Sequence, residues 1–320
     1  MPRVTISMEK TSTPAPTLHV DTATPTPPPA ELGLAENPLI LALAPSADSS
    51  EQINAAREIA AQLMERTGYV VVTVVPDSYA ALVGSLEKGN AHIVLLDPLS
   101  YALAYQKDLA HAQFAVIKDG KFKYGAQFLA ARKDGYVSNY DPLKDTNTTE
   151  ADTALAQFND KKPCWSEETS PSGYIVPLGL LNQLQVQTRP AAFVGGQTTV
   201  VRSLYAGGIC DFGATYIDAR KFPSLEDAMP DLIEQVIVVW QVPEIIPFEV
   251  IAFSTKMPQP MRDLFANTIP AVMQTDDGNA AFKTAYDIEE LQVVNNGDFN
   301  EFHVLVDESR VNLTLLLNAQ

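Results

Sequence analysis

Hydrophobic and polar positions follow two patterns along the chain from residue 37 onward. Residues 39–44 are a continuous apolar run, which predicts a strand covered on both faces. Residues 49–52 (Ser-Ser-Glu-Gln) then form a capping-box pattern that begins a helix, and Gly68 ends it. The apolar positions of this helix have the spacing of one helical face: Ile53, Ala56, Ile59, Ala60 and Leu63.

The same alternation of strand and helix continues to residue 98. It predicts strands at 70–75 and 92–96, and helices at 78–86 and from Pro98. This β-α-β-α-β order favours a parallel sheet with right-handed crossovers.

A second series of elements begins after about residue 160. The predicted elements are helices at 172–181 and 198–206, strands at 192–194, 212–215 and 236–240, and final helices at 261–274, 279–287 and 300–317. The predicted fold class is therefore α/β, with two sheets and a ligand crevice between them.

Residues 1–36 are rich in threonine and proline and contain few large apolar side chains. Proline removes backbone donors and holds φ near polyproline values, so we expect a disordered, solvated linker. Such stalks often separate an anchored N-terminus from a folded receptor domain. Residues 1–10 have no apolar signal region and no cysteine for lipid attachment. Either the export signal is missing from this chain, or the protein is cytosolic.

Composition narrows the classes of partner. The chain of 320 residues has 39 acidic and 22 basic side chains, a formal charge of −17, which repels phosphate backbones. We therefore expect no nucleic-acid binding and no role on an anionic membrane. Hydrophobic residues make up 46% and charged residues 19%, as in soluble folded proteins, and no apolar run approaches the ~20 residues of a membrane span.

Catalytic motifs are absent from the sequence. It contains no G-x-S-x-G, H-E-x-x-H, C-x-x-C, G-x-G-x-x-G or Walker lysine loop. Residues 145–149 resemble a calcium loop but lack its glycine and its final glutamate. Four histidines and two cysteines leave little material for a metal site or a thiol enzyme. We expect no enzyme activity, no metal site and no cofactor.

A cluster of hydroxyl groups immediately precedes a predicted helix. Thr169, Ser170 and Ser172 are followed by Gly173 and an apolar run. Free N–H groups at a helix start, with the positive end of the helix dipole, favour an anion, and the hydroxyls would add donors without positive charge. That donor set suits a tetrahedral oxyanion such as a phosphonate. The same residues also fit an ordinary serine N-cap followed by a loop.

The pattern Ser-x-Ser-Gly-Tyr followed by an apolar stretch and a proline resembles a known family. It is similar to the anion-binding segment of phosphate, phosphite and phosphonate substrate-binding proteins of ABC importers. Other segments resemble that family in the same order along the chain, and together they cover nearly everything after Asn37. These segments are residues 38–48, 67–89, 96–101, 194–216 and 240–247.

The resemblance implies a type II periplasmic binding protein fold. In that fold each of two lobes has a mostly parallel sheet flanked by helices, and two strands form the hinge. The first lobe would be residues 37–133 plus 249–320, and the second lobe residues 134–248, carrying the anion-binding helix start. Ligand binding on one lobe would be followed by closure of the other.

The resemblance also implies the site residues. Thr169, Ser170, Ser172 and the backbone of Gly173 would hold the anion. The remaining candidates would close over the ligand or meet its organic end: Tyr79, Tyr101, Gln197, Tyr216 and Asp218. Each tyrosine of the first lobe also fits a half-buried ring with its hydroxyl at the surface.

Two departures from the family pattern leave the anion open. Pro171 stands where the family often has threonine, which removes one hydroxyl and one N–H. Gln197 stands where histidine is frequent, and it cannot supply a titratable donor. Phosphate, phosphite, phosphonate and an unrelated solute all stay candidates.

Cys164 and Cys210 lie in the same predicted lobe. They fit a disulfide that would close a loop of about fifty residues and contribute ~4 kcal/mol, or two buried free thiols. A disulfide would place the protein in an oxidising compartment. With the Thr/Pro stalk, this favours a periplasmic or cell-surface receptor that is tethered to the membrane.

The resemblance implies capture of a small oxyanion or organophosphonate and its delivery to an ABC permease by a monomeric protein. One alternative is a ligand-sensing domain of the same fold coupled to a signalling protein. A second is an enzyme on the same scaffold, such as a relative of thiamin-pyrimidine synthases. That class needs histidine- or cysteine-rich segments, which this sequence lacks.

Overall fold

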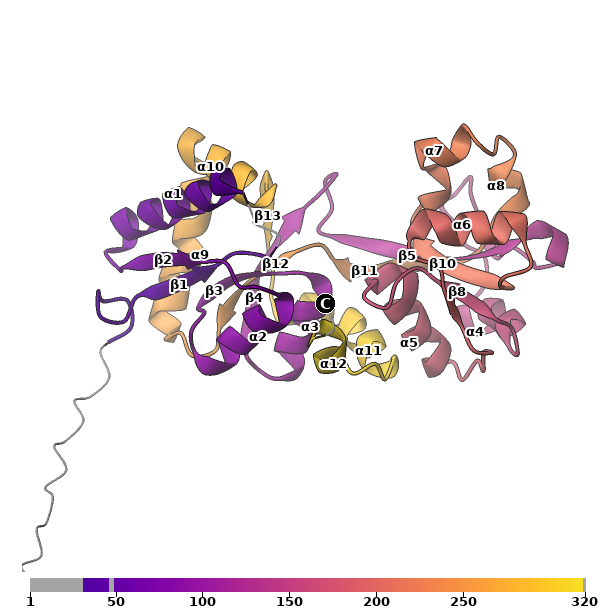
Figure 1. The fold of residues 1–320 in the computed structure, drawn as a ribbon, viewed down its shortest axis with the longest axis horizontal. Helices are drawn as coiled ribbons and strands as arrows, with labels where there is room; N and C mark the ends of the chain where they lie inside the picture. The colour runs from indigo at the N-terminus through magenta and orange to yellow at the C-terminus, as the bar shows by residue number, and fades with distance from the viewer. Residues whose placement is uncertain (1–30, 46–48, 319–320) are drawn as a thin grey trace, which may run out of the picture.

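The computed structural model describes residues 31–45 and 49–318. Two α/β lobes lie next to each other along the long axis of the molecule, and the chain crosses between them in the middle (Figure 1). Most of the predicted linker, residues 1–30, lies outside the described residues.

Residues 31–36, which the sequence predicts as linker, belong to the folded body. The N–H of Gly33 donates to the carbonyl of Asn37 (2.7 Å), and its own carbonyl accepts from the N–H of Val70 (2.8 Å). Gly33 has a φ of +91°, and a Cβ there would lie 2.5 Å from Cδ1 of Tyr69, so this close approach requires glycine. The linker prediction is wrong for this short segment, because composition does not reveal such backbone pairing.

The first lobe is built on a six-stranded sheet with the order β13-β4-β12-β3-β1-β2. Strand β1 is parallel to β2 and β3, whereas β12 is antiparallel to β3 and β4, and β13 is antiparallel to β4. The strands are β1 (Leu39–Ala42), β2 (Val71–Val74), β3 (Ile93–Leu96), β4 (Ala110–Ile117), β12 (Val250–Ser254) and β13 (Glu290–Val293).

The second lobe is built on a five-stranded sheet with the order β11-β5-β10-β8-β9. Strand β8 is parallel to β9 and β10, whereas β5 is antiparallel to both β10 and β11. The strands are β5 (Lys123–Ala131), β8 (Pro163–Trp165), β9 (Ala192–Phe193), β10 (Phe212–Tyr216) and β11 (Val236–Pro247), with a separate hairpin of β6 (Tyr140–Asp141) and β7 (Thr146–Asn147).

The two sheets share one topology. Each has three parallel strands (β2-β1-β3 and β9-β8-β10), then one antiparallel strand (β12 and β5), then a further strand (β4 and β11). In both sheets the antiparallel strand is the first that forms after the chain has crossed from the other lobe. The two crossings, residues 118–122 and 248–249, are the only covalent links between the sheets among the described residues. The predicted α/β fold with two lobes is confirmed. The predicted hinge of two strands corresponds to these two short crossings, which lie between β4 and β5 and between β11 and β12.

The lobe boundary predicted at residue 133 is wrong. Strand β5, which lies before that residue, pairs with β10 and β11 in the second sheet. The chain therefore leaves the first lobe at residues 118–122. The pairing that decides this joins residues about a hundred positions apart, so local sequence patterns do not contain it.

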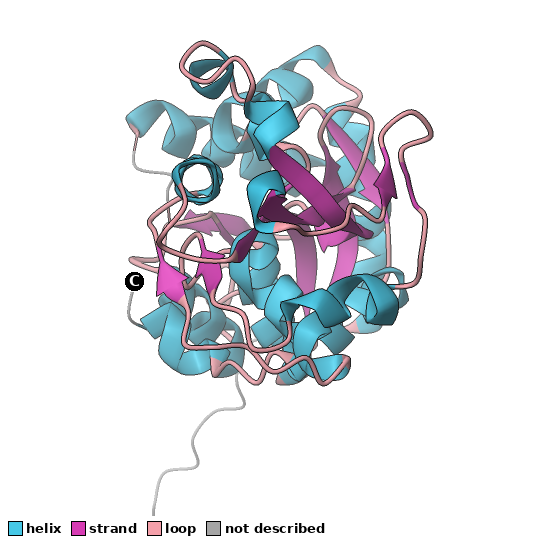
Figure 2. Cartoon of the chain, turned by 90° about the vertical axis from the view of Figure 1, so that its right-hand side faces the viewer, coloured by secondary structure: helices cyan, strands magenta, loops and turns pink. Residues whose placement is uncertain are grey.

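Helices cover both faces of each sheet. In the first lobe α1 (Ser50–Thr67), α9 (Gln259–Met273) and α10 (Asp276–Tyr286) share one apolar core, and α2 (Tyr79–Lys88) and α3 (Pro98–Gln106) share another. Figure 2 views the second lobe end-on, with helices on both sides of its strands. The second lobe's helices are α4 (Ala151–Leu155) and α5 (Val176–Gln183) on one face, and α6 (Gln197–Ala206), α7 (Pro223–Glu226) and α8 (Leu232–Gln235) on the other.

The two C-terminal helices lie between the lobes (Figure 1). Helix α11 (Asn300–Glu308) packs against α5 of the second lobe, and α12 (Leu313–Asn318) packs against α2 and α3 of the first. Phe302, Leu305 and Leu313 are buried in one apolar cluster with residues of both lobes. The assignment of all residues from 249 to 320 to the first lobe is therefore wrong for α11, whose apolar face is buried largely by the second lobe.

The first helix shows why the local sequence folds as it does. Ser49 accepts a hydrogen bond from the N–H of Gln52 (3.1 Å), and the Gln52 side chain accepts from the N–H of Ser49 (3.4 Å). Gly68 ends the helix in the left-handed conformation, with φ +76°. The predicted capping box and stop are both confirmed.

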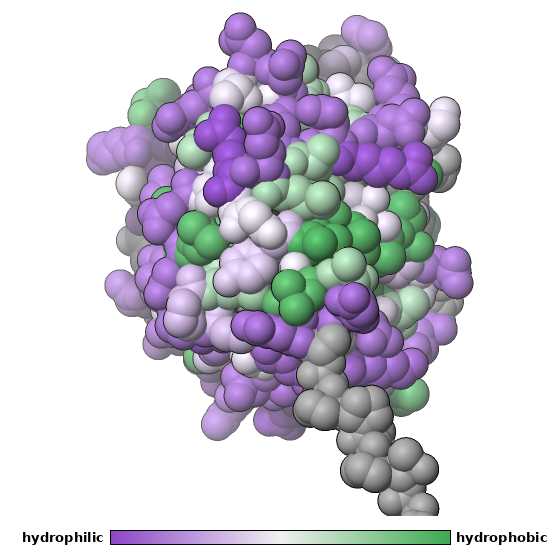
Figure 3. All heavy atoms as spheres, turned by 90° about the vertical axis from the view of Figure 1, so that its left-hand side faces the viewer, coloured by the Kyte–Doolittle hydropathy of each residue, from purple (hydrophilic) through white to green (hydrophobic). Residues whose placement is uncertain are grey.

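The outer end of the first lobe carries a group of hydrophobic side chains among hydrophilic ones (Figure 3). Strand β2 is an edge strand of the first sheet, and Val72, Val74 and Val75 are 37–38% exposed. None of the described helices is long and apolar enough to cross a membrane.

Candidate functional site

The hydroxyl cluster lies where the chain passes from β8 into a helix. A π-helical turn, Pro171–Ile175, begins that helix and α5 continues it. Ser170 is the N-cap: its Oγ accepts from the N–H of Gly173 (3.0 Å), and its carbonyl accepts from the N–H of Ile175 (3.0 Å). The start of the helix thus has the N-cap that the sequence predicts, with proline in the first turn, where its missing N–H is tolerated.

Gln197, the first residue of α6, connects this helix start to the sheet. Its Nε2 donates to Ser170 Oγ (2.9 Å) and lies 3.5 Å from Ser172 Oγ. Its Oε1 accepts from the backbone N–H of Tyr216 (3.2 Å). Because the backbone occupies the amide oxygen, the amide nitrogen is held toward the two serine hydroxyls. Gln197 therefore takes the position of a neutral hydrogen-bond donor.

Gly173 stands at a point of close approach. A Cβ there would lie 2.0 Å from Ser166 Oγ and 2.9 Å from Gln197 Nε2. Ser166 is 1% exposed, and its hydroxyl has no hydrogen-bond partner among the described residues. Any larger residue at position 173 would push the Gln197 amide away from the serines, so glycine keeps the network compact.

A cavity of about 600 Å3 opens in front of this network, between the two lobes. It is lined by five of the residues that the sequence predicts as ligand-binding: Thr169, Ser170, Ser172, Gln197 and Tyr216. The structure thus brings together residues from the helix start, α6 and β10 around one cavity.

Tyr124 and Phe248 also line the cavity, and the sequence analysis did not single them out. Their rings stack at 5.0 Å with an angle of 26°. The Tyr124 hydroxyl is hydrogen-bonded to Ser172, and burial, the larger effect, raises the pKa of this phenol. Tyr124 is therefore a neutral phenol beside the serine cluster. It lies on β5 and Phe248 lies in the return crossing, and no motif marks either position.

The charged side chains that line the cavity are carboxylates: Asp119, Glu167 and Glu249. Glu249 pairs with Lys118 across the two crossing segments, with 2.9 Å between Lys118 Nζ and Glu249 Oε2. The donors that face the cavity are therefore hydroxyl and amide groups. Such donors hold an anion by hydrogen bonds, and a hydrogen bond to a charged group contributes about 1.5–3 kcal/mol.

The structure does not bring Tyr79 and Tyr101 to the cavity. Tyr101 is fully buried, its hydroxyl donates to Asn296 Oδ1 (3.0 Å), and its ring meets that of Phe299 edge-on at 5.4 Å. Burial raises the pKa of Tyr101. Tyr79 is partly buried against the apolar clusters of the first lobe and of the lobe junction. Both rings stabilise packing.

The carboxylate of Asp218 is also engaged by other side chains of the protein. Its carboxylate pairs with the guanidinium of Arg220 (2.6 Å) and accepts from Gln127 Nε2 (2.7 Å). Burial raises the pKa of Asp218, but the hydrogen bonds and charge of Arg220 outweigh it, so the pKa lies below its usual value. Asp218 is not among the residues that line the cavity, although its neighbours Tyr216 and Ile217 are.

Cys164 and Cys210 form a disulfide with 5.6 Å between their Cα atoms. Cys164 lies on β8, which leads to the serine cluster, and Cys210 precedes β10, which leads to Tyr216. The bond fastens the two strands behind the cavity. In the described part of the chain, no group of three or more His, Cys, Asp or Glu side chains could hold a metal ion.

Comparison with known proteins gives one family. The model of the periplasmic substrate-binding protein of phosphonate ABC transporters matches residues 41–299. None of the curated proteins matches the chain in sequence.

Solved structures similar to the chain include three with different ligands or roles. XAC2383 from Xanthomonas citri, bound to ATP, has a TM-score of 0.62 and 15% identity, covering 85% of this chain and 96% of its own. PhnD1 from Prochlorococcus marinus, in complex with methylphosphonate, has a TM-score of 0.51 and 13% identity, covering 85% and 98%. Transferrin 1 from Manduca sexta has a TM-score of 0.52 and 12% identity, covering 84% and 46%. At these identities the likeness shows a shared fold, and the predicted periplasmic binding protein fold is confirmed.

Proposed function

Because the chain belongs to the family of periplasmic substrate-binding proteins of phosphonate ABC transporters, we propose that it captures a phosphonate-, phosphite- or phosphate-type oxyanion outside the cytoplasm and delivers it to an ABC permease. The family is that of the substrate-binding component of a transporter, and we propose a solute-binding role for this chain. The serine–glutamine network at the helix start is the single observation that carries the choice of ligand.

That network supplies what a tetrahedral oxyanion requires. Ser170, Ser172 and Gln197 present neutral donors at one wall of the cavity, beside the start of a helix. Ser170 and Ser172 are 8% and 3% exposed, so a hydrogen bond made there is shielded from water. Tyr124 adds a phenol that stays protonated at neutral pH.

Closure of the two lobes would complete the site. The helix start and Gln197 belong to the second lobe, whereas Pro98 and Glu249 line the cavity from the first. Rotation about residues 118–122 and 248–249 would change the gap between these walls. A ligand that contacts both walls favours the closed form, because those contacts do not exist when the lobes are apart.

The compartment follows from the same family. The disulfide between Cys164 and Cys210 suits an oxidising environment, as is found outside the cytoplasm. Among the similar structures, the complex of PhnD1 with methylphosphonate supports the choice of ligand class. We infer a monomeric receptor held near the membrane through its N-terminal segment.

Thermal unfolding against a panel of anions tests this proposal. The panel is phosphate, phosphite, methylphosphonate, aminoethylphosphonate and sulfate. A ligand at a hundred times its Kd stabilises the folded state by about 2.7 kcal/mol, which raises the unfolding midpoint by several degrees. We expect at least one phosphorus oxyanion to do so.

Two variants locate the binding. In a Ser170→Ala/Ser172→Ala double variant the shift should disappear. Ser85→Ala, on α2 of the first lobe, changes a hydroxyl that does not line the cavity and should keep it. If no phosphorus oxyanion raises the midpoint of the native protein, the proposed ligand class is wrong.

A further inference from the structure

A second cavity, of about 540 Å3, lies next to the first. The two cavities share part of their walls: Asp119, Tyr124, Ile217 and Phe248 line both. The stacked rings of Tyr124 and Phe248 thus form part of the wall of both cavities. The second cavity begins where the wall of the oxyanion site ends.

The size of this space decides what kind of ligand uses it. Pockets of roughly 300–1,000 Å3 suit organic molecules of drug-like size. The first cavity alone already exceeds what a phosphate or methylphosphonate group fills. A second cavity beside it adds space of the size that a substantial organic group needs.

One wall of the second cavity is held in place by hydrogen bonds within the protein. The β6–β7 hairpin forms part of it, through Asp145, Thr146 and Asn147. Asn147 Nδ2 donates to the carbonyl of Gln241 (2.8 Å), and its Oδ1 accepts from the N–H of Gln241 (2.9 Å). These two bonds fasten the hairpin to β11, so the wall does not depend on a ligand for its position.

Charges of both signs line this cavity in equal number. It is lined by three lysines and three acidic residues. Lys121 pairs with Glu244, which also lines the cavity, and Lys118 pairs with Glu249 of the first cavity. Lys123 donates to the backbone carbonyl of Asp298 (3.2 Å). The three lysines and three acidic residues give the lining no net charge that would select a charged tail. A neutral group with several hydroxyls could donate to the carboxylates and accept from the ammonium groups.

We propose that the second cavity binds the organic part of the ligand, and that this part is a neutral polyhydroxyl group, as in a sugar or polyol phosphate or phosphonate. This inference rests on the proposed oxyanion site and names the class of ligand that the site takes. Thr146 and Asp119 supply a hydroxyl and a carboxylate with no hydrogen-bond partner among the described side chains.

Calorimetric titration with four phosphate monoesters tests it, because they share one head group. Methyl phosphate has no tail, glucose 6-phosphate has a neutral polyhydroxyl tail, phosphoethanolamine a cationic tail, and phosphoglycolate an anionic tail. We expect glucose 6-phosphate to bind at least about tenfold more tightly than the other three.

A variant that fills the cavity gives the matched comparison. Thr146→Trp should weaken glucose 6-phosphate by about tenfold and change methyl phosphate by no more than about twofold. Leu143→Trp adds the same ring to the tip of the same hairpin, where Leu143 is 96% exposed and lines neither cavity, and should change neither affinity.

The outcomes distinguish a failure of this inference from a failure of the proposed oxyanion-binding function. If methyl phosphate and glucose 6-phosphate bind equally, or a charged tail binds best, the inference is overturned while the oxyanion site stands. Equal weakening of both esters by Thr146→Trp also overturns it. If neither the esters nor methylphosphonate binds the native protein, the proposed function fails and this inference fails with it.

Discussion

Gln197 is the residue whose chemistry most directly sets the charge of the site. Its amide oxygen is occupied by the N–H of Tyr216, so its nitrogen donates toward Ser170 and Ser172. Gln197→Glu replaces this donor by an oxygen that carries negative charge. We expect the affinity for methylphosphonate to fall by about 100-fold, because a hydrogen bond to an anion is lost and repulsion is added.

Histidine at the same position is the control. Gln197→His keeps an N–H donor, so its affinity should stay within about tenfold of the native value. Calorimetric titration measures all three proteins, and thermal unfolding shows whether each is folded. Native-like binding by Gln197→Glu would contradict the assigned role of the amide.

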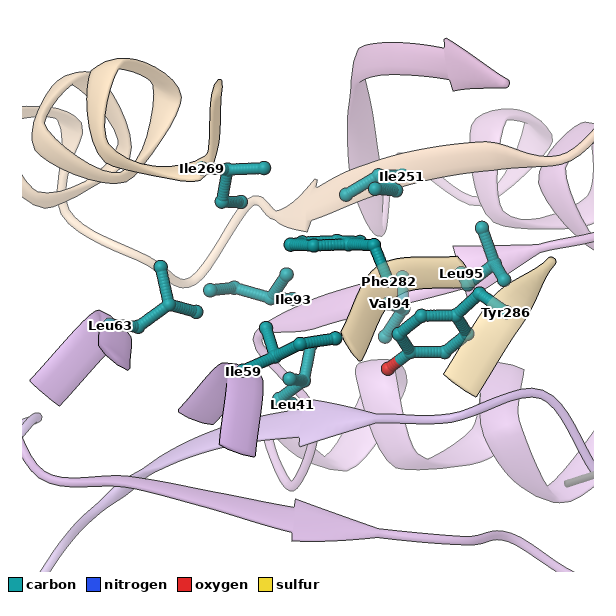
Figure 4. Close-up of a pocket in the computed structure, with 10 residues that line it drawn as sticks. All are labelled: Leu41, Ile59, Leu63, Ile93, Val94, Leu95, Ile251, Ile269, Phe282 and Tyr286. Atoms are coloured by element: carbon teal, nitrogen blue, oxygen red, sulfur yellow. The ribbon is translucent and has the colours of Figure 1, made fainter. Parts of the chain in front are cut away.

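Tyr286 places a hydroxyl group in the apolar core of the first lobe. Figure 4 shows its ring among apolar side chains of the first lobe, such as Leu95 and Phe282, around a residual cavity of about 10 Å3. Its hydroxyl is buried and has no hydrogen-bond partner among the described residues. Burial accordingly raises the pKa of Tyr286.

Removal of that hydroxyl should not destabilise the protein. Tyr286→Phe removes an unsatisfied polar group, so the free energy of unfolding should stay equal or rise by up to about 1 kcal/mol. Tyr101→Phe, which removes the bond to Asn296, should lower it by about 1 kcal/mol. Urea unfolding compares the two variants, and a loss of stability in Tyr286→Phe larger than that in Tyr101→Phe would refute this reading.

At the residue scale, the predicted candidates that line the cavity are those with a local sequence signal. The hydroxyl cluster at the helix start and Gln197 lie at the cavity, because a short segment determines a helix start. Asp218 does not line it because it pairs with the neighbouring Arg220 and accepts from Gln127. Tyr101 does not line it, because its partner Asn296 is distant in the sequence. Tyr124 was missed for the same reason.

At the scale of elements, the disulfide between β8 and the loop before β10 provides a test. The two cysteines are 46 residues apart, and closing a loop of that length contributes about 4 kcal/mol. A Cys164→Ala/Cys210→Ala variant should therefore lose about 4 kcal/mol of unfolding free energy. Urea unfolding of both proteins without reductant measures the difference, and a loss below about 1 kcal/mol would contradict a stabilising bond.

His303, on helix α11, provides a second test, through the pH dependence of the protein's stability. The imidazole is 4% exposed, stacks on Tyr105 at 3.8 Å, and has no hydrogen-bond partner on either nitrogen among the described residues. Burial lowers the pKa of His303 to about 4, opposed by the charge of Asp307. In the unfolded state the pKa of a histidine is about 6.5, its usual value.

The sign of the pH dependence follows from these two values. Above pH 6.5 the imidazole of His303 is neutral in both the folded and the unfolded state, so the free energy of unfolding has its full value. As the pH falls from 6.5 toward 4, the unfolded state takes up a proton that the folded state does not, and about 3 kcal/mol is lost. His303→Phe should remove this part of the slope. Identical slopes for the native protein and the variant in urea unfolding between pH 7 and pH 4 would contradict it.

Elements were predicted best where the hydrophobic period is clear. The helix Ser50–Thr67 has a capping box, an apolar stripe and a terminal glycine, and all three lie as predicted. Strand β5 was not predicted, since it contains three alanines, which favour helix when isolated. Its pairing with β10 and β11 makes it a central strand, so tertiary contacts override propensity.

At the scale of the whole molecule, the order of elements predicted two α/β units but not how the chain is shared between them. The crossing at residues 118–122 and the position of α11 and α12 between the lobes depend on long-range packing. These features matter for function, since α11 and α12 bury apolar surface against both lobes. Closure about the hinge must therefore preserve or repack this junction.

The most direct test of the central claim is a crystal structure of the chain grown with methylphosphonate. The account predicts the phosphonyl oxygens within hydrogen-bonding distance of Ser170 Oγ, Ser172 Oγ and Gln197 Nε2, with the two lobes closed over the ligand. Methylphosphonate bound away from the helix start, or an empty cleft at a concentration that raises the unfolding midpoint, would contradict it.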